Sequence, residues 1–87
     1  MTIEELRSRI SEIDNQLLTL LTERMEISCL VGEYKAEHNV PVLDEGREVA
    51  IIRGVEEKSE RFSEQNTAVY KEIMHQSRGL QQKIKKN

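Results

Sequence analysis

The chain of 87 residues contains no tryptophan, one proline, one cysteine and four glycines. Aromatic residues make up only 3% of the chain, which excludes a core built mainly from aromatic side chains. The scarcity of proline and glycine leaves few turns and favours long helices. Because Cys29 is the only cysteine, no intramolecular disulfide can form, and the N-terminal stretch MTIEEL lacks the apolar core of a signal peptide. We therefore expect a protein of the reducing cytoplasm.

The sequence also lacks three features that would indicate other classes of protein. Its longest apolar run, LLTLL at residues 17–21, is far too short to span a membrane. The 13 lysines and arginines do not outnumber the 16 acidic residues, which argues against general nucleic-acid binding. Cys29, His38 and His75 are scattered and form no metal-ligand motif. The sequence therefore predicts no membrane partner, no nucleic-acid partner and no bound metal.

What the sequence does contain is a long heptad pattern of apolar residues. Its a and d positions, with Arg24 as the one exception, are Ile3, Leu6, Ile10, Ile13, Leu17, Leu20, Ile27, Val31 and Tyr34. Thr2 and Glu5 form a capping-box pattern, so we predict a helix from about residue 3 to about residue 37. Such a helix is about 50 Å long, whereas a compact chain of this size is about 30 Å across. We therefore expect this helix to pack along a second copy, in a two-fold homodimer.

Two shorter helices follow, which gives an all-α fold of three helices in a single domain, residues 1–87. Pro41 ends the first helix, because proline disfavours helical geometry at the residue before it. Asp44 is a good N-cap for a second helix over about residues 44–60. Asn66 could cap the third helix, with Ser63 as the rival cap. The apolar stripe of this helix is Val69, Ile73, Leu80 and Ile84.

Polar residues interrupt two of these apolar faces. Arg24 breaks the heptad, and Ser77 occupies the stripe of the third helix, with Gln81 four residues on and on the same side. Considered without the other residues, Arg24 can be interpreted as a polar residue that sets the register of a helical seam. Ser77 alone is a tolerated small residue whose hydroxyl bonds back to its own helix.

Two further cations belong to the same pattern. Lys35 lies three turns after Arg24 on nearly the same side of the helix, about 17 Å away. Arg47 stands in the first turn of the second helix, where the exposed N–H groups are already positive and favour an anion. Each alone reads as an ordinary surface residue, but packed helices would place both around one cavity with Arg24, Ser77 and Gln81. Such a pocket suits a small, dianionic, hydroxylated molecule, and Ser77 has no histidine to complete a hydrolase triad.

The polar residues resemble those of the all-helical chorismate mutases, in the same order along nearly the whole chain. The matching positions are Arg7, Arg24, Lys35, Asp44, Arg47, Glu48, Ser77 and Gln81. The stretch LRSRISEIDNQLLTLLTERMEISCLVGEYK is similar to the first helix of that family, and PVLDEGREVAII resembles the segment that opens its second helix. Arg78 and Gly79 depart from the apolar residues that usually follow the serine, and glycine is a poor helix former.

The resemblance implies an isomerase that converts chorismate to prephenate by an intramolecular Claisen rearrangement, in phenylalanine and tyrosine biosynthesis and without a cofactor. It also implies an intertwined homodimer with two active sites. Arg7 and Arg24 are about 25 Å apart on one helix, so Arg7 would enter the site of the other chain. There the two arginines would bind the substrate carboxylates, with Arg47 and Ser77 assisting.

The resemblance assigns the remaining four residues to the other parts of the substrate. Lys35 and Gln81 would hydrogen-bond the ether oxygen, which makes them catalytic together with Arg24. Glu48, with the helix start at Asp44, would hold the ring hydroxyl.

Two other functions compete with this interpretation. An isochorismate pyruvate-lyase shares the fold and the cationic pocket, but Glu48 matches the mutase residue that holds the hydroxyl at its chorismate position. A non-catalytic dimerisation or regulatory domain is the other alternative, and the complete set of eight residues argues against it.

Overall fold

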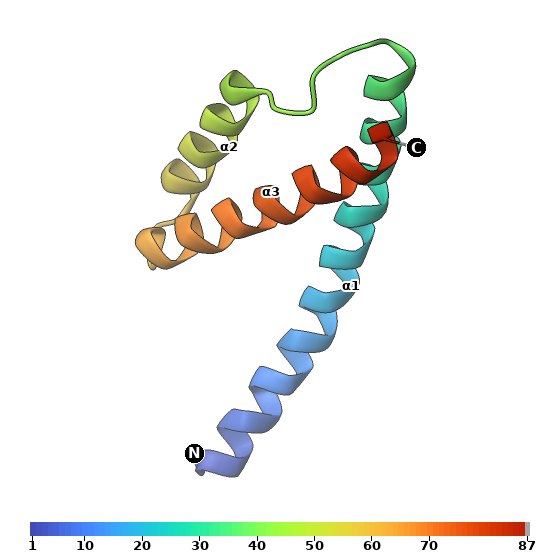
Figure 1. Ribbon diagram of the computed structural model, residues 1–87. Helices are drawn as coiled ribbons and strands as arrows, with labels where there is room; N and C mark the ends of the chain where they lie inside the picture. The colour runs from blue at the N-terminus through green and yellow to red at the C-terminus, as the bar shows by residue number, and fades with distance from the viewer. Residues whose placement is uncertain (87) are drawn as a thin grey trace.

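The computed structural model describes residues 1–86 and contains three α-helices (Figure 1). They are α1 (Ile3–Glu37), α2 (Glu45–Lys58) and α3 (Ser63–Lys86). No strand is present in this part of the chain. The prediction of an all-α chain with three helices and a long first helix is therefore confirmed.

The ends of α1 are fixed by local hydrogen bonds. Thr2 caps the N-terminus, where its hydroxyl oxygen accepts from the backbone N–H of Glu5 at 3.2 Å. At the other end, the Val40 N–H donates to the Lys35 carbonyl at 2.9 Å, and Asn39 between them adopts a left-handed φ of 55°. This is the geometry of a Schellman motif, in which asparagine can replace glycine. The left-handed conformation of Asn39, two residues before Pro41, therefore ends the helix.

The starts of α2 and α3 differ in how well the sequence indicates them. Asp44 caps α2 as predicted, because its Oδ1 accepts from the Arg47 N–H at 3.0 Å. The prediction of Asn66 as the cap of α3 is wrong. The Asn66 N–H donates to the Phe62 carbonyl at 2.9 Å, so Asn66 already lies inside the helix, and its side-chain amide donates to Ser59 Oγ at 3.0 Å. The chain turns at Phe62, which has a φ of 60°, and Ser63 is the first helical residue.

The three helices form an elongated molecule and not a globule. In Figure 1, α3 crosses the C-terminal half of α1 and lies beside α2, while the N-terminal half of α1 extends away from both. The chain measures 54 × 26 × 14 Å and has a radius of gyration of 16.0 Å, against about 12 Å for a compact chain of this length. The extended half of α1 therefore has no partner within its own chain.

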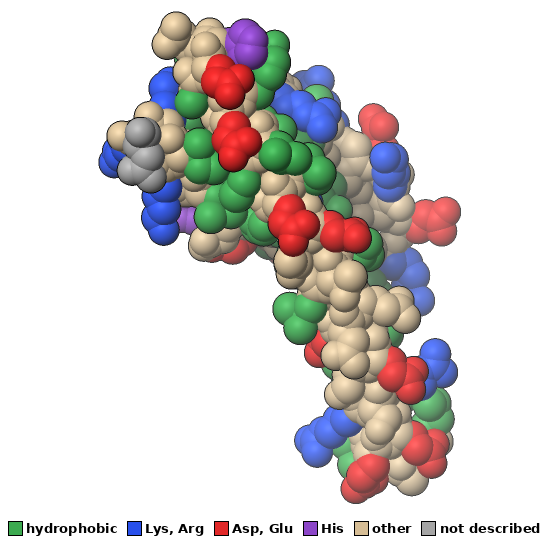
Figure 2. All heavy atoms as spheres, turned by 90° about the vertical axis from the view of Figure 1, so that its right-hand side faces the viewer, with side chains coloured by type: hydrophobic (Ala, Val, Ile, Leu, Met, Phe, Trp, Pro, Cys, Tyr) green, Lys and Arg blue, Asp and Glu red, His purple; other side chains and the backbone are tan. Residues whose placement is uncertain are grey.

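The apolar face of α1 is largely exposed. All nine apolar residues of the heptad are solvent-exposed, from 39% at Val31 to 62% at Leu20. The buried hydrophobic residues are only Val42 and Met74 among residues 1–86. Figure 2 shows hydrophobic side chains at the surface of the thick part of the molecule and along the extended arm. Within residues 1–86, no helix combines the length and the apolar character needed to cross a membrane.

Candidate active site

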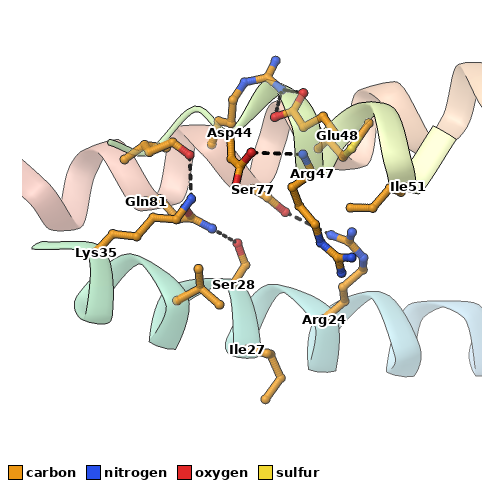
Figure 3. A pocket seen from close by; sticks show the side chains of 14 residues that line it. Arg24, Ile27, Ser28, Lys35, Asp44, Arg47, Glu48, Ile51, Ser77 and Gln81 are labelled. Atoms are coloured by element: carbon orange, nitrogen blue, oxygen red, sulfur yellow. Dashed lines mark hydrogen bonds and ion pairs between the residues drawn. The ribbon is translucent and has the colours of Figure 1, made fainter. Parts of the chain in front are cut away.

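A pocket of about 320 Å³ opens between the three helices (Figure 3). It is lined by Arg24, Ile27, Ser28, Val31, Lys35, Val42, Asp44, Arg47, Glu48, Ile51, Met74, Ser77, Arg78 and Gln81. Each helix contributes, as does the loop between α1 and α2. The structure thus brings seven of the eight residues selected from the sequence to one place.

Arg7 is the residue that does not reach the pocket. It is exposed on the extended half of α1, and seventeen residues of helix separate it from Arg24, about 25 Å. Because an α-helix of this length is rigid on that scale, Arg7 cannot reach the pocket of its own chain.

Arg24 and Ser77, which interrupt the apolar faces of α1 and α3, face each other across the contact of these helices. Arg24 Nη1 donates to Ser77 Oγ at 3.3 Å, and the Ser77 hydroxyl is within 3.7 Å of Met25 Sδ. Ser77 is buried and Arg24 is half-buried. Ser77 thus has a polar partner in this otherwise apolar contact, and Arg24 keeps donors that Ser77 does not use.

Gln81 is held against α1 by one hydrogen bond and one close approach. Its Nε2 donates to Ser28 Oγ at 2.9 Å, and both side chains are buried. Opposite Gln81, a Cβ added at Gly32 would lie 3.0 Å from Gln81 Cγ and 3.2 Å from Gln81 Cα. Gly32 thus lets the two helices approach closely. The sequence reasoning missed Ser28 and Gly32, although two small residues four apart on one helix face are the signal that could have indicated them.

Lys35 connects α1 to the loop that precedes α2. Its Nζ donates to the carbonyl of the buried Val42 at 2.7 Å. On the same loop, Lys85 Nζ from α3 donates to the Val40 carbonyl at 3.3 Å. Since an ammonium group has three donors, Lys35 can hold the loop and still donate to a ligand in the pocket.

The first turn of α2 carries both a cation and a carboxylate. Arg47 is exposed, and in Figure 3 its guanidinium points toward the same part of the pocket as that of Arg24. Neither arginine forms a salt bridge within residues 1–86. Glu48 does: Arg78 Nη1 lies 2.6 Å from each of its carboxylate oxygens. The sequence indicates Arg78 only as a departure from the apolar residues expected after Ser77, because helical periodicity does not show which residue of α2 it faces.

The charge of the pocket favours an anion. Four cationic side chains and two carboxylates line it, which leaves a net charge of +2. The guanidinium groups of Arg24 and Arg47, which form no salt bridge within residues 1–86, can bind carboxylates in a bidentate manner. Ser77 is bonded to a cation and not to a base, an arrangement that cannot generate a nucleophile. No group of three or more His, Cys, Asp or Glu within residues 1–86 could hold a metal ion.

Comparison with known proteins identifies a family and two relatives whose names include chorismate mutase. The sequence model of the family described as chorismate mutase type II matches residues 6–82. Similar proteins include a bifunctional chorismate mutase/prephenate dehydratase of Aquifex aeolicus, 30% identical over 89 aligned residues, which covers 95% of this chain and 25% of the relative. A chorismate mutase of Methanocaldococcus jannaschii is 39% identical over 46 residues, or 53% of this chain and 46% of the relative.

A third relative, the T-protein of Haemophilus influenzae, is 33% identical over 51 residues, or 59% of this chain and 14% of the relative. The chain therefore aligns with less than half the length of each of these relatives. No solved structure matches it significantly.

Proposed function

Because this chain belongs to the type II chorismate mutase family, we propose that it is an isomerase that converts chorismate to prephenate in aromatic amino-acid biosynthesis. The observation that carries the proposal is the pocket, where seven residues of the family pattern lie together although they come from three helices and a loop. The names of two relatives, which include chorismate mutase, support the same reaction. The expected location is a reducing cytoplasm, because Cys29 is the only cysteine.

The working form of the protein would be an intertwined homodimer. Its support is the exposed apolar heptad of α1, together with a helix that extends well beyond the rest of its chain. Burial of each exposed leucine or isoleucine by a second copy would contribute about 1.5–3 kcal/mol. An antiparallel, two-fold arrangement of the α1 helices brings Arg7 of the second copy to the pocket of the first. Each site would then contain all eight residues.

Cationic residues would hold the two substrate carboxylates. Arg24 and Arg47 direct their guanidinium groups to the same part of the pocket, and Arg7 of the second copy would add a third guanidinium group. Ser77, which already accepts from Arg24, would hold that side chain in place. The lining residues of one chain alone, with a net charge of +2, already match the charge of a dianion.

The chemical step needs no cofactor, base or nucleophile. In the Claisen rearrangement one C–O bond breaks while one C–C bond forms in the same molecule, so no proton is transferred. The protein contributes by holding the folded conformer of the substrate and by stabilising the negative charge that develops on the ether oxygen. Lys35 and Gln81 each retain a free N–H beyond the bond they make within the chain, and these would donate to that oxygen.

Glu48 and Asp44 would bind the far side of the substrate. A carboxylate accepts hydrogen bonds and cannot donate them, which suits a ring hydroxyl that donates its proton. Both residues lie at the start of α2, with Asp44 held by its capping bond to the Arg47 N–H. The site would therefore place cations at the carboxylate end of the substrate and anions at its hydroxyl end.

The direct test is the incubation of the purified chain with chorismate, followed by absorbance and by identification of the product. Conversion to prephenate at a rate that depends on protein concentration is the expected result. Parallel incubation with isochorismate, with an assay for pyruvate, tests the lyase activity. Pyruvate formation without prephenate would assign the site to the lyase, and inactivity on both substrates would show a non-catalytic domain.

A further inference from the structure

Residues 1–86 contain one salt bridge, between Arg78 of α3 and Glu48 of α2, although the whole chain has 13 basic and 16 acidic residues. Both oxygens of the carboxylate lie 2.6 Å from the same nitrogen, Nη1. The pair lines the pocket and is about two-thirds buried, with the Arg78 side chain 32% exposed and that of Glu48 25% exposed. Isolated pairs on an open surface contribute little, but this pair is short, sheltered and situated in the site.

The pair has two effects on the carboxylate. It fixes the long Glu48 side chain in one orientation, with both oxygens directed at α3. It also supplies Glu48 with its own counterion. Without Arg78, the Glu48 carboxylate could instead pair with another cation of the pocket, Arg24, Lys35 or Arg47. These are the residues that would bind a dianionic substrate.

Pairing with Arg78 leaves Glu48 able to bind a ligand. Each carboxylate oxygen has about two acceptor positions, and Arg78 Nη1 occupies only one on each. A hydroxyl in the pocket can therefore donate to Glu48 while the salt bridge remains intact.

We propose that Arg78 is a positioning residue, which holds Glu48 in place to accept the hydrogen bond of the substrate's ring hydroxyl and keeps it from pairing with the cations that bind the carboxylates. This inference rests on the proposed function. It adds a ninth residue to the site, at a position where the family resemblance leads one to expect an apolar side chain.

The test uses Arg78→Met, which removes the charge and the donors but keeps an unbranched, flexible side chain. Arg53→Met is the matched control, because it makes the same change of charge at an exposed position of α2 outside the pocket. A group that orients the substrate equally in the ground and transition states changes KM and not kcat. For Arg78→Met we therefore expect KM for chorismate to rise about tenfold, roughly the effect of one charge-assisted hydrogen bond, while kcat changes less than about twofold. Arg53→Met should match the parent.

Two additional variants test whether Arg78 affects substrate binding through Glu48. Arg78→Lys keeps the charge and one donor, and it should recover most of the lost affinity. Glu48→Gln should weaken binding by itself, and adding Arg78→Met to it should change KM little further, because the two residues act as a unit. Circular dichroism would establish that each variant is folded, and Arg78→Gln, which also removes the charge, carries the test if Arg78→Met does not fold.

The outcomes separate this inference from the proposed function. A parent chain that does not convert chorismate overturns both. If the parent is active and Arg78→Met has the KM of Arg53→Met, only the positioning role is overturned. Independent, multiplicative effects of Arg78→Met and Glu48→Gln would also overturn it, because Arg78 would then contact the substrate directly. A lowered unfolding temperature with unchanged KM would show a purely structural salt bridge.

Discussion

Gly32→Ala tests whether the close contact of α1 and α3 positions Gln81. The added methyl group would lie 3.0 Å from Gln81 Cγ and 3.2 Å from Gln81 Cα, whereas carbon atoms pack best at about 3.5–4.0 Å. The backbone of α3 must therefore move by roughly 0.5 Å at this point. The bond from Gln81 Nε2 to Ser28 Oγ, now 2.9 Å, would lengthen with it.

The expected effects on activity and stability follow from this displacement. A shift of about 1 Å in a positioned group can cost about a hundredfold in rate, so a shift of half that size should lower kcat about tenfold. Alanine is favoured over glycine inside a helix by about 1 kcal/mol, but overpacking costs about 1–3 kcal/mol. The free energy of unfolding should therefore fall by about 1 kcal/mol, which lowers Tm by about 4–8 °C in a domain of this size.

Gly79→Ala is the matched control, since a Cβ at Gly79 meets no atom within 4 Å. It should raise Tm, because the helix propensity increases and nothing is overpacked, and it should leave kcat unchanged. The measurements are the rate of chorismate loss at saturating substrate and thermal unfolding by circular dichroism. A Gly32→Ala protein with parental kcat, or one stabilised as much as Gly79→Ala, would refute the role assigned to this contact.

Three further predictions concern the assembly and the site. Light scattering at micromolar concentration should give about twice the chain mass of 10.1 kDa, and an active monomer would contradict the shared site. Arg7→Ala and Arg24→Ala should each nearly abolish activity. Mixing the two inactive proteins should restore part of the activity, because one site of the mixed dimer keeps both arginines. Subunit exchange without recovery of activity would contradict the placement of Arg7. Gln81→Glu should lower kcat/KM about a hundredfold near neutral pH. The kcat/KM of the variant should recover as the pH falls, because only the protonated acid can donate to the ether oxygen. Equal pH profiles of variant and parent would contradict this role.

The helices could be predicted from the sequence because their signals are local. Thr2 and Asp44 are capping residues at the positions where capping residues are needed, and the apolar periodicity of α1 continues, interrupted only by Arg24, up to the predicted end. The start of α3 could not be predicted in the same way. It depends on a left-handed conformation at Phe62, which an aromatic residue rarely adopts and which no sequence pattern indicates.

The site was predictable to the extent that its residues contradict their surroundings. Arg24 and Ser77 were noticeable because each is polar on an apolar face, and the structure pairs them. Ser28 contributes by accepting from Gln81 and Gly32 by being small, and neither residue type is unusual at a single position of a helix. The partner of Arg78 is determined by how α2 lies against α3, and that arrangement depends on the two connecting loops and not on helical periodicity.

The two lysine contacts of the α1–α2 loop have a consequence for when this segment becomes ordered. Val40 and Val42 present carbonyls on either side of Pro41, and each accepts from an ammonium group, one from α3 and one from α1. The conformational entropy of the loop is thus lost once, when the chain folds. Substrate binding does not have to immobilise this segment again, so the affinity for the ligand is not reduced by an ordering step. A ligand that enters the pocket therefore meets Asp44 and the first turn of α2 already in place.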